Sequence, residues 1–207
     1  MDNRFALNHM HLDVLREVGS IGTSHAVTSL SVILNKKVEM GIPKVSLVDF
    51  ADVSNFVGGA ESIVAGILVH LSGDINGMMM FLTEERCCKP LVADLFAGTG
   101  MDISGDGDGI SEAVLSALSE VGNILAGAYL SSFADLIRKK IRSSAPSICV
   151  DMAQAVLSVP AIEFGKISDK VLLIESVFKS NEADISGYFL LIPDFESFKT
   201  IFSSLGV

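Results

Sequence analysis

Two sets of three polar residues with matching spacing are the part of this 207-residue sequence best suited to chemistry. In each set the second residue follows the first by four positions and the third follows by three more, which places all three on one side of an α-helix. A carboxylate one turn from a hydroxyl or a carboxamide combines a charge with a group that can hold a water molecule. We call them the first stripe, Asp13, Glu17 and Ser20, and the second stripe, Ser116, Glu120 and Asn123.

Each stripe lies on a segment whose apolar residues recur at helical spacing. The two predicted helices span residues 10–35 and 112–140. Lys36 and Lys37 directly follow the first and Arg138-Lys139-Lys140 close the second, and such cations suit the negative end of a helix dipole. Each stripe also has two glycines near it, although glycine in a helix costs about 0.5–1 kcal/mol relative to alanine. We therefore expect a close backbone approach at the stripes and little steric obstruction to another protein, while ordinary exposed polar residues remain the alternative.

The two helices belong to an internal repeat. Residues 15–47 match residues 118–150 at a shift of 103, and Asp74–Gly77 matches Asp184–Gly187 at a shift of 110. We expect one domain over residues 1–207, made of two units at about 1–98 and 111–207. The segment between them, 98–110, is rich in glycine and aspartate and is predicted to be a linker.

Each unit is predicted to contain a helix, then strands, then a helix. Asn76-Gly77 favours a hairpin turn, and the continuous apolar run Met78–Leu82 indicates a strand buried on both faces. The sequence predicts an α+β fold whose halves are related by a pseudo-two-fold axis and share one sheet or two abutting sheets. The predicted strands are Val45–Val48, Ile63–Ser72, Gly77–Thr83, Ile148–Val150, Val171–Lys179 and Tyr188–Ile192, and the closing helices are Glu84–Phe96 and Phe195–Leu205.

Composition excludes several classes of partner. The chain carries 15 Lys and Arg against 25 Asp and Glu, and its net charge of −10 disfavours nucleic acid and anionic membranes. Apolar runs such as Ile63–Val69 are far shorter than the roughly 20 residues of a membrane helix. Residues 1–11 are polar and mixed, unlike a secretory leader. We expect a cytoplasmic protein without membrane insertion.

Other potential metal ligands in the sequence are poorly spaced. The cysteines are odd in number and two are adjacent, which suits neither a disulfide framework nor a zinc site. The aspartates of the linker fall at positions 1, 5 and 7 of a possible calcium loop, which is the wrong spacing for calcium. The N-terminal histidines have no acidic or thiol residue at ligand spacing. We expect buried free thiols, a solvated linker, surface histidines, and no cofactor or metal of the protein's own. These residues are Cys87, Cys88 and Cys149, then Asp102, Asp106 and Asp108, then His9 and His11.

The stripes and the prolines that follow them resemble a known family. The pattern Asp/Ser-x3-Glu-x2-Asn-x22-Pro, present twice, is similar to that of the CheC family of chemotaxis phosphatases. The second stripe fits it at every position, with 22 residues between Asn123 and Pro146. The first stripe has the same spacing up to Pro43, but Ser20 stands where the family has asparagine. The resemblance extends over both units and their order.

This resemblance implies a CheC-like fold and an enzyme that removes the phosphoryl group from the aspartyl phosphate of a CheY-type response regulator. It implies that Asn123 orients the attacking water and that Glu120 docks against a lysine of the receiver, while a general-base role for Glu120 stays open. The receiver is expected to supply its own Mg²⁺. Asp13 and Ser116 are supporting positions. Glu17 and Ser20 form a degenerate site that is expected to bind the receiver with little turnover.

Other functions remain open. The chain could act mainly as a binding module that sequesters a chemotaxis partner, such as the deamidase CheD or the phosphorylated receiver, with weak catalysis. A flagellar-switch phosphatase of the FliY type would carry a further C-terminal domain, which we do not expect after Val207. The shorter CheX type carries one motif and dimerises, whereas this chain carries two. A hydrolase with its own nucleophile is disfavoured because no G-x-S-x-G motif is present.

Overall fold

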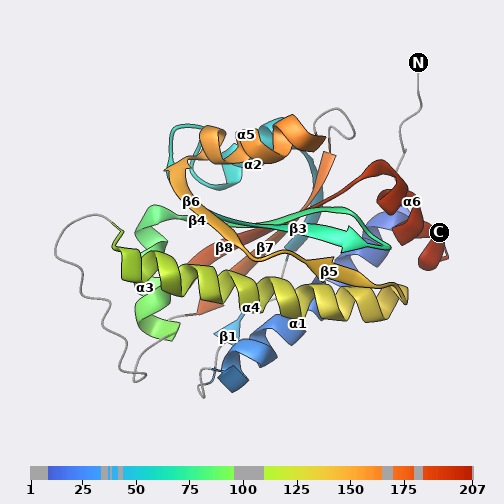
Figure 1. Cartoon of the computed structure of the whole chain (residues 1–207), viewed down its shortest axis with the longest axis horizontal. Helices are drawn as coiled ribbons and strands as arrows, with labels where there is room; N and C mark the ends of the chain where they lie inside the picture. The colour runs from blue at the N-terminus through green and yellow to red at the C-terminus, as the bar shows by residue number, and fades with distance from the viewer. Residues whose placement is uncertain are drawn as a thin grey trace.

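The computed structural model of the chain describes residues 9–33, 37, 39–41, 44–95, 110–164, 170–179 and 184–206. Long helices α1 and α4 cover one face of an antiparallel sheet, and the shorter α2 and α5 cover the other (Figure 1). The helices are α1 (His9–Ile33), α2 (Val53–Phe56) after a 3₁₀ turn at Phe50–Asp52, α3 (Glu85–Leu95), α4 (Glu112–Ile137), α5 (Ala153–Phe164) and α6 (Phe195–Ser204). The strands are β1 (Glu39–Met40), β2 (Lys44–Asp49), β3 (Ile63–Gly73), β4 (Gly77–Glu84), β5 (Ile141–Ser143), β6 (Ser147–Met152), β7 (Lys170–Lys179) and β8 (Asp184–Pro193).

The strand order of the sheet is symmetric about its centre, because corresponding strands of the two halves (β1 and β5, β7 and β3, β8 and β4) lie at equal distances from the middle. It runs β1-β7-β8-β4-β3-β5, with β2 also on β7 and β6 also on β3. The two hairpins, β3–β4 and β7–β8, meet at the centre through β4 and β8. The strands that follow α1 pair with the hairpin of the C-terminal half, and those that follow α4 pair with the hairpin of the N-terminal half. The chain therefore builds one shared sheet, and the prediction of an α+β fold is confirmed.

The central strands are buried on both faces, as the run Met78–Leu82 predicts. Met79 and Phe81 of β4 belong to the core beneath α1 and α4, to which α3 and α6 also contribute. Met78, Met80 and Leu82 belong to a second core beneath α2 and α5. Because a strand alternates its side chains, only layers on both faces of the sheet allow such an uninterrupted apolar run.

The boundaries of the elements follow the turn residues. Gly73 and Gly77, which flank the β3–β4 turn, both have positive φ, at 114° and 147°. The prediction that the second long helix reaches residue 140 is wrong, since α4 ends at Ile137 and Arg138 turns into the left-handed region with φ 53°. At its other end α4 is capped by Ser111, whose side chain accepts a hydrogen bond of 3.3 Å from the Val114 N–H. These two ends fix how much of α4 lies over the sheet.

Of the three cysteines, Cys88 alone is fully buried as the sequence predicts. Cys88 is buried, and this burial raises the pKa of its thiol to about 12, so the thiol is neutral. Cys87 is half-buried. Cys149 is exposed, because among the described strands β6 pairs with β3 alone and its side chains alternate between half-buried and exposed positions. The expectation of buried thiols is therefore wrong for Cys149 and holds only in part for Cys87. The linker aspartates and the side chains of His9 and His11 lie outside the described residues.

Helix α4 is also apolar enough to be considered as a membrane-spanning helix. Within the part of the chain that the structure describes, it is the one helix whose length and composition would suffice to cross a membrane. Half of its most apolar window is nevertheless buried inside the protein, where Leu118, Val121, Leu125 and Phe133 pack in the core. The apolar character of α4 is thus used in packing against the sheet.

The contact between α1 and α4 contains a buried hydroxyl group whose removal is expected to stabilise the fold slightly. Tyr129 is fully buried, and its hydroxyl has no hydrogen-bond partner among the described atoms. Since an unpaired buried polar group costs about 1–3 kcal/mol, Tyr129→Phe is expected to raise the free energy of unfolding by about 1 kcal/mol in urea denaturation. Tyr129→Ala, which removes the ring as well, should lower it by about 3–5 kcal/mol. A marked loss of stability in Tyr129→Phe would mean that the hydroxyl is hydrogen-bonded.

Candidate active site

Both stripes lie on the side of their helix that faces away from the sheet. On α4, Ser116, Glu120 and Asn123 are all exposed. On α1, Asp13 and Glu17 are exposed, whereas Ser20 is only partly so. The structure therefore presents the carboxylates and the amide to solvent, as the helical spacing predicts.

The glycines near the stripes face inward, toward the protein's own core. A Cβ atom on Gly19 would lie 2.4 Å from Cγ2 of Val45, and one on Gly122 would lie 2.6 Å from Cγ2 of Ile67. The predicted close approach thus exists, but it is the approach of each helix to the sheet beneath it. The expectation that these glycines clear the way for another protein is wrong at both positions. Gly127 differs, because a Cβ there would meet no atom of the described residues within 4 Å.

The two stripes do not meet in one site. Figure 1 shows α1 and α4 running in opposite directions across the sheet. They touch where a Cβ on Gly22 would lie 2.5 Å from the ring of Tyr129. Both stripes precede this contact along their own helices, so in antiparallel helices they lie on opposite sides of it. At 1.5 Å per residue, Glu17 and Asn123 are each about 8–9 Å from it in opposite directions along the helix axes.

The charged groups of the two stripes have different surroundings. In the first stripe, Oδ1 of Asp13 accepts a hydrogen bond of 2.8 Å from Arg16, an exposed ion pair of small energy. Among the described residues, Glu17 has no ion-pair partner, and neither Glu120 nor Asn123 has a side-chain hydrogen bond. Arg16 was missed by the sequence analysis, although its position three residues after Asp13 is the usual spacing of a helical ion pair.

The second stripe has the geometry to act on a bound partner. Glu120 and Asn123 are three residues apart on one exposed helical face, so one visiting surface can meet both. The amide accepts with its oxygen and donates with its NH₂, and can therefore fix the orientation of one water molecule. Within the described ranges, no three His, Cys, Asp or Glu side chains gather in a way that could hold a metal ion.

Comparison of the sequence with a family profile and with known proteins points to one group of relatives. A sequence profile of the CheC-like family matches residues 10–47 and 114–150, the segments that contain both stripes. The chain is 33% identical over 197 residues to the CheY-P phosphatase CheC of Bacillus subtilis, covering 94% of this chain and 93% of that protein. It is 30% identical over 146 residues to the flagellar motor switch phosphatase FliY of the same organism, covering 69% of this chain and 36% of that longer protein.

Solved structures share the fold. The crystal structure of FliY from Thermotoga maritima superimposes with a TM-score of 0.72 at 20% sequence identity, covering 98% of both chains. The middle domain of FliM from H. pylori gives a TM-score of 0.63 at 10% identity, covering 96% of this chain and 99% of the other. At such identities these likenesses establish the architecture alone. The 33% identity to the Bacillus relative over nearly its whole length, together with the matching family profile, shows that this chain belongs to the CheC-like family.

Proposed function

We propose that this protein is a phosphatase that hydrolyses the aspartyl phosphate of a CheY-type response regulator in chemotaxis. The observation that carries the proposal is the pair Glu120 and Asn123, exposed together on α4 with no partner among the described side chains. The names of the Bacillus relatives, a CheY-P phosphatase and a flagellar motor switch phosphatase, support the same activity. The protein is proposed to act in the cytoplasm, where its substrate is found.

The proposed reaction is an in-line attack of water on phosphorus. Phosphoryl transfer asks mainly for placement and electrostatic stabilisation, so a protein without a nucleophile of its own can accelerate it. The carboxamide of Asn123 holds the attacking water behind the phosphorus. The carboxylate of Glu120 pairs with a lysine of the receiver and sets the register of α4 on it. The substrate brings its own Mg²⁺.

The two stripes are proposed to differ in activity. Ser20 offers a hydroxyl, which is shorter than a carboxamide and has no NH₂, and it is also only partly exposed. A water held there would lie at the wrong depth, and losing one well-placed hydrogen bond to a transition state costs on the order of 3 kcal/mol. The second stripe is therefore the main catalytic site, and the first stripe binds a receiver with little turnover.

The activity is tested by phosphate release from a CheY-type receiver loaded with acetyl phosphate. The protein should release many phosphates per chain when it is present far below the receiver concentration. This outcome also separates catalysis from the second candidate function, sequestration of the phosphorylated receiver or of a CheD-type deamidase, which the partly exposed Ser20 favours. A sequestering protein would not shorten the lifetime of the phosphorylated receiver at such ratios.

Phosphate release through the second stripe should depend only weakly on salt. The chain carries a net charge of −10, so long-range attraction to an acidic receiver does not assist binding, and the contact between Glu120 and a lysine is short-ranged. Raising ionic strength from low to physiological values is expected to lower kcat/KM no more than about threefold. A steep decline over the same range would mean that a more electrostatic interface governs turnover.

A further inference from the structure

A dense group of cations follows the end of α4. We call Arg138, Lys139, Lys140 and Arg142 the basic turn. These four residues fall within five positions, although the whole chain has only 15 Lys and Arg and a net charge of −10. Such a concentration of positive charge creates a local potential opposite to that of the molecule as a whole.

The cations of the basic turn are unpaired in the part of the chain that the structure describes. Arg138, Lys140 and Arg142 are exposed and Lys139 is half-buried, and none of them forms an ion pair there. Other cations of the surface are neutralised, as Lys37 is by Glu39 and Lys44 is by Glu175. The basic turn therefore keeps its charge available to a partner.

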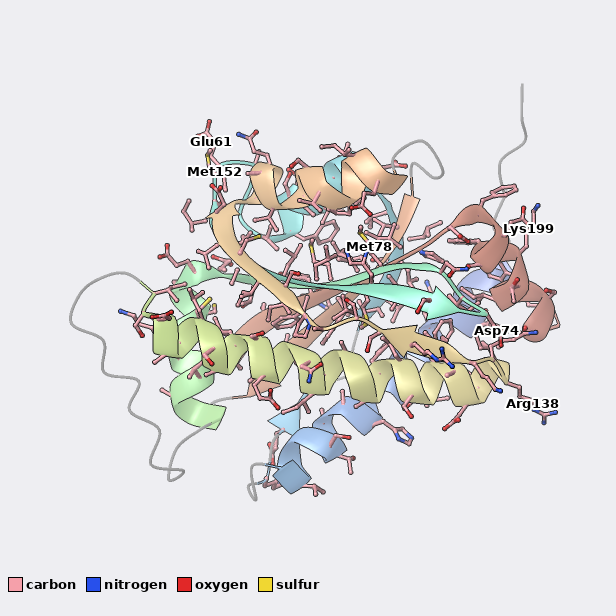
Figure 2. All side chains as sticks on the ribbon, viewed as in Figure 1. Glu61, Asp74, Met78, Arg138, Met152 and Lys199 are labelled. Carbon is pink, nitrogen blue, oxygen red and sulfur yellow. The ribbon has the colours of Figure 1, made fainter. Side chains whose placement is uncertain are left out.

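The backbone of the basic turn is held in place. The Lys140 N–H donates to Oδ2 of Asp74 at 2.9 Å, and the carbonyl oxygen of Lys140 accepts from the Asp74 N–H at 2.9 Å. Arg142 lies on β5 opposite Ser72 of β3. Asp74 and Asp135 are the acidic neighbours along these elements, which leaves an excess of positive charge. Figure 2 shows Arg138 projecting from the end of α4, away from the body of the molecule, with Asp74 close by.

The basic turn lies at the same end of the molecule as the first stripe. Because α1 and α4 are antiparallel and touch at Gly22 and Tyr129, the C-terminal part of α4 lies beside the N-terminal part of α1 (Figure 1). A protein interface covers about 800 Å² per partner, or about 30 Å across. One docked domain can therefore cover Glu17 and the basic turn together.

We propose that the basic turn is an electrostatic docking site for the acidic surface of a phosphorylated receiver seated on the first stripe. This inference rests on the proposed function and deepens it, because it assigns the stripe with Ser20 a means of holding a receiver that it dephosphorylates poorly. A phosphoryl group adds roughly two negative charges, which the basic turn attracts while the rest of this acidic chain repels them. Binding at the first stripe is thus favoured by phosphorylation and weakened by salt.

The test uses the full chain with its second stripe disabled by Glu120→Ala and Asn123→Ala. In this background three of the four cations of the basic turn are neutralised by Lys139→Gln, Lys140→Gln and Arg142→Gln. The probe is a CheY-type receiver trapped in its active form with beryllium fluoride and Mg²⁺. Its Kd is measured by fluorescence anisotropy at low and at physiological salt. A matched control neutralises three cations that form surface ion pairs elsewhere: Lys37→Gln, Lys44→Gln and Arg86→Gln.

Neutralising the basic turn should raise Kd about tenfold at low salt and remove most of its salt dependence, while the control stays within about twofold of the background. Equal effects of the two triple variants, or no binding by the background protein, would overturn the proposal. The cations also favour the C-terminal end of the α4 dipole, and thermal unfolding measures that separate contribution. Phosphate release by the wild-type chain reports independently on the proposed function, so the two failures are distinguishable.

Discussion

Replacement of Asn123 by alanine is expected to lower the rate of phosphate release from a phosphorylated receiver at least about a hundredfold. The amide is the proposed support for the attacking water, and removing one preorganised hydrogen bond to a transition state costs about 3–4 kcal/mol. Its side chain is exposed on α4 and is not part of the core, so the fold should be unaffected. The effect should appear in kcat under saturating receiver, with little change in the Kd for the beryllofluoride-trapped receiver.

The matched control for this prediction is Ser20→Ala at the corresponding position of α1. Since the hydroxyl is proposed to contribute little turnover, this variant should retain most of the wild-type rate. Comparable losses in Asn123→Ala and Ser20→Ala would show that the two stripes contribute equally and that the proposed asymmetry is wrong. Circular dichroism and the free energy of unfolding of both variants establish that the rates are compared between folded proteins.

Replacement of Glu120 by glutamine is expected to raise KM for the phosphorylated receiver by at least about 30-fold. Glu120 is exposed and has no ion-pair partner among the described residues, so its charge is free to meet a lysine of the receiver. Truncating one member of a charge pair that is buried in a complex typically costs about 2–5 kcal/mol. Because glutamine keeps the size of the side chain, the measured loss reports on the charge.

Glu112→Gln supplies the control for Glu120→Gln. Glu112 is an exposed acid in the first turn of the same helix and is not part of the stripe. It should leave KM nearly unchanged. A fall in kcat without a change in KM for Glu120→Gln would instead indicate that the carboxylate acts as a general base, the alternative that the sequence left open.

Much of the fold is predictable because local pattern and tertiary structure agree. The hairpins β3–β4 and β7–β8 follow from apolar runs on either side of turn residues, and α1 and α4 follow from helical periodicity. The end of α4 is less predictable, because the helix stops at Arg138, a non-glycine residue in the left-handed region, three residues before β5 begins at Ile141. No glycine marks that turn in the sequence.

Other elements cannot be predicted from the local sequence of a single segment. Helix α5 contains Pro160 and is apolar on most sides, so neither periodicity nor a helix signal distinguishes it. Strands β1 and β5 have only two and three residues and exist because β7 and β3 offer them an edge. The exchange of β2 and β6 between the halves is likewise a tertiary feature, since pairing partners far apart in sequence leave no local trace.

The candidate site is predictable within each helix but not between helices. Spacing alone places Glu120 and Asn123 on one face, and the structure has both exposed. Spacing cannot tell whether the glycines allow close contact with the sheet or with another protein. In the structure, Gly19 and Gly122 face the sheet. It also says nothing of how α1 crosses α4. The antiparallel crossing separates the stripes and brings the basic turn to the first of them.

Moving the amide from α4 to α1 tests whether a carboxamide at this helical position is what makes the protein catalytic. The single variant Asn123→Ser should lose most of the phosphate release, and the double variant Ser20→Asn with Asn123→Ser should recover a substantial part of it, because Glu17 already stands three residues before position 20. Release is measured with the same phosphorylated receiver and with the chain at catalytic concentration. A double variant that still binds the receiver yet stays as inactive as Asn123→Ser would rule out this role, since a carboxamide beside a carboxylate on an exposed helix would then not suffice for the reaction.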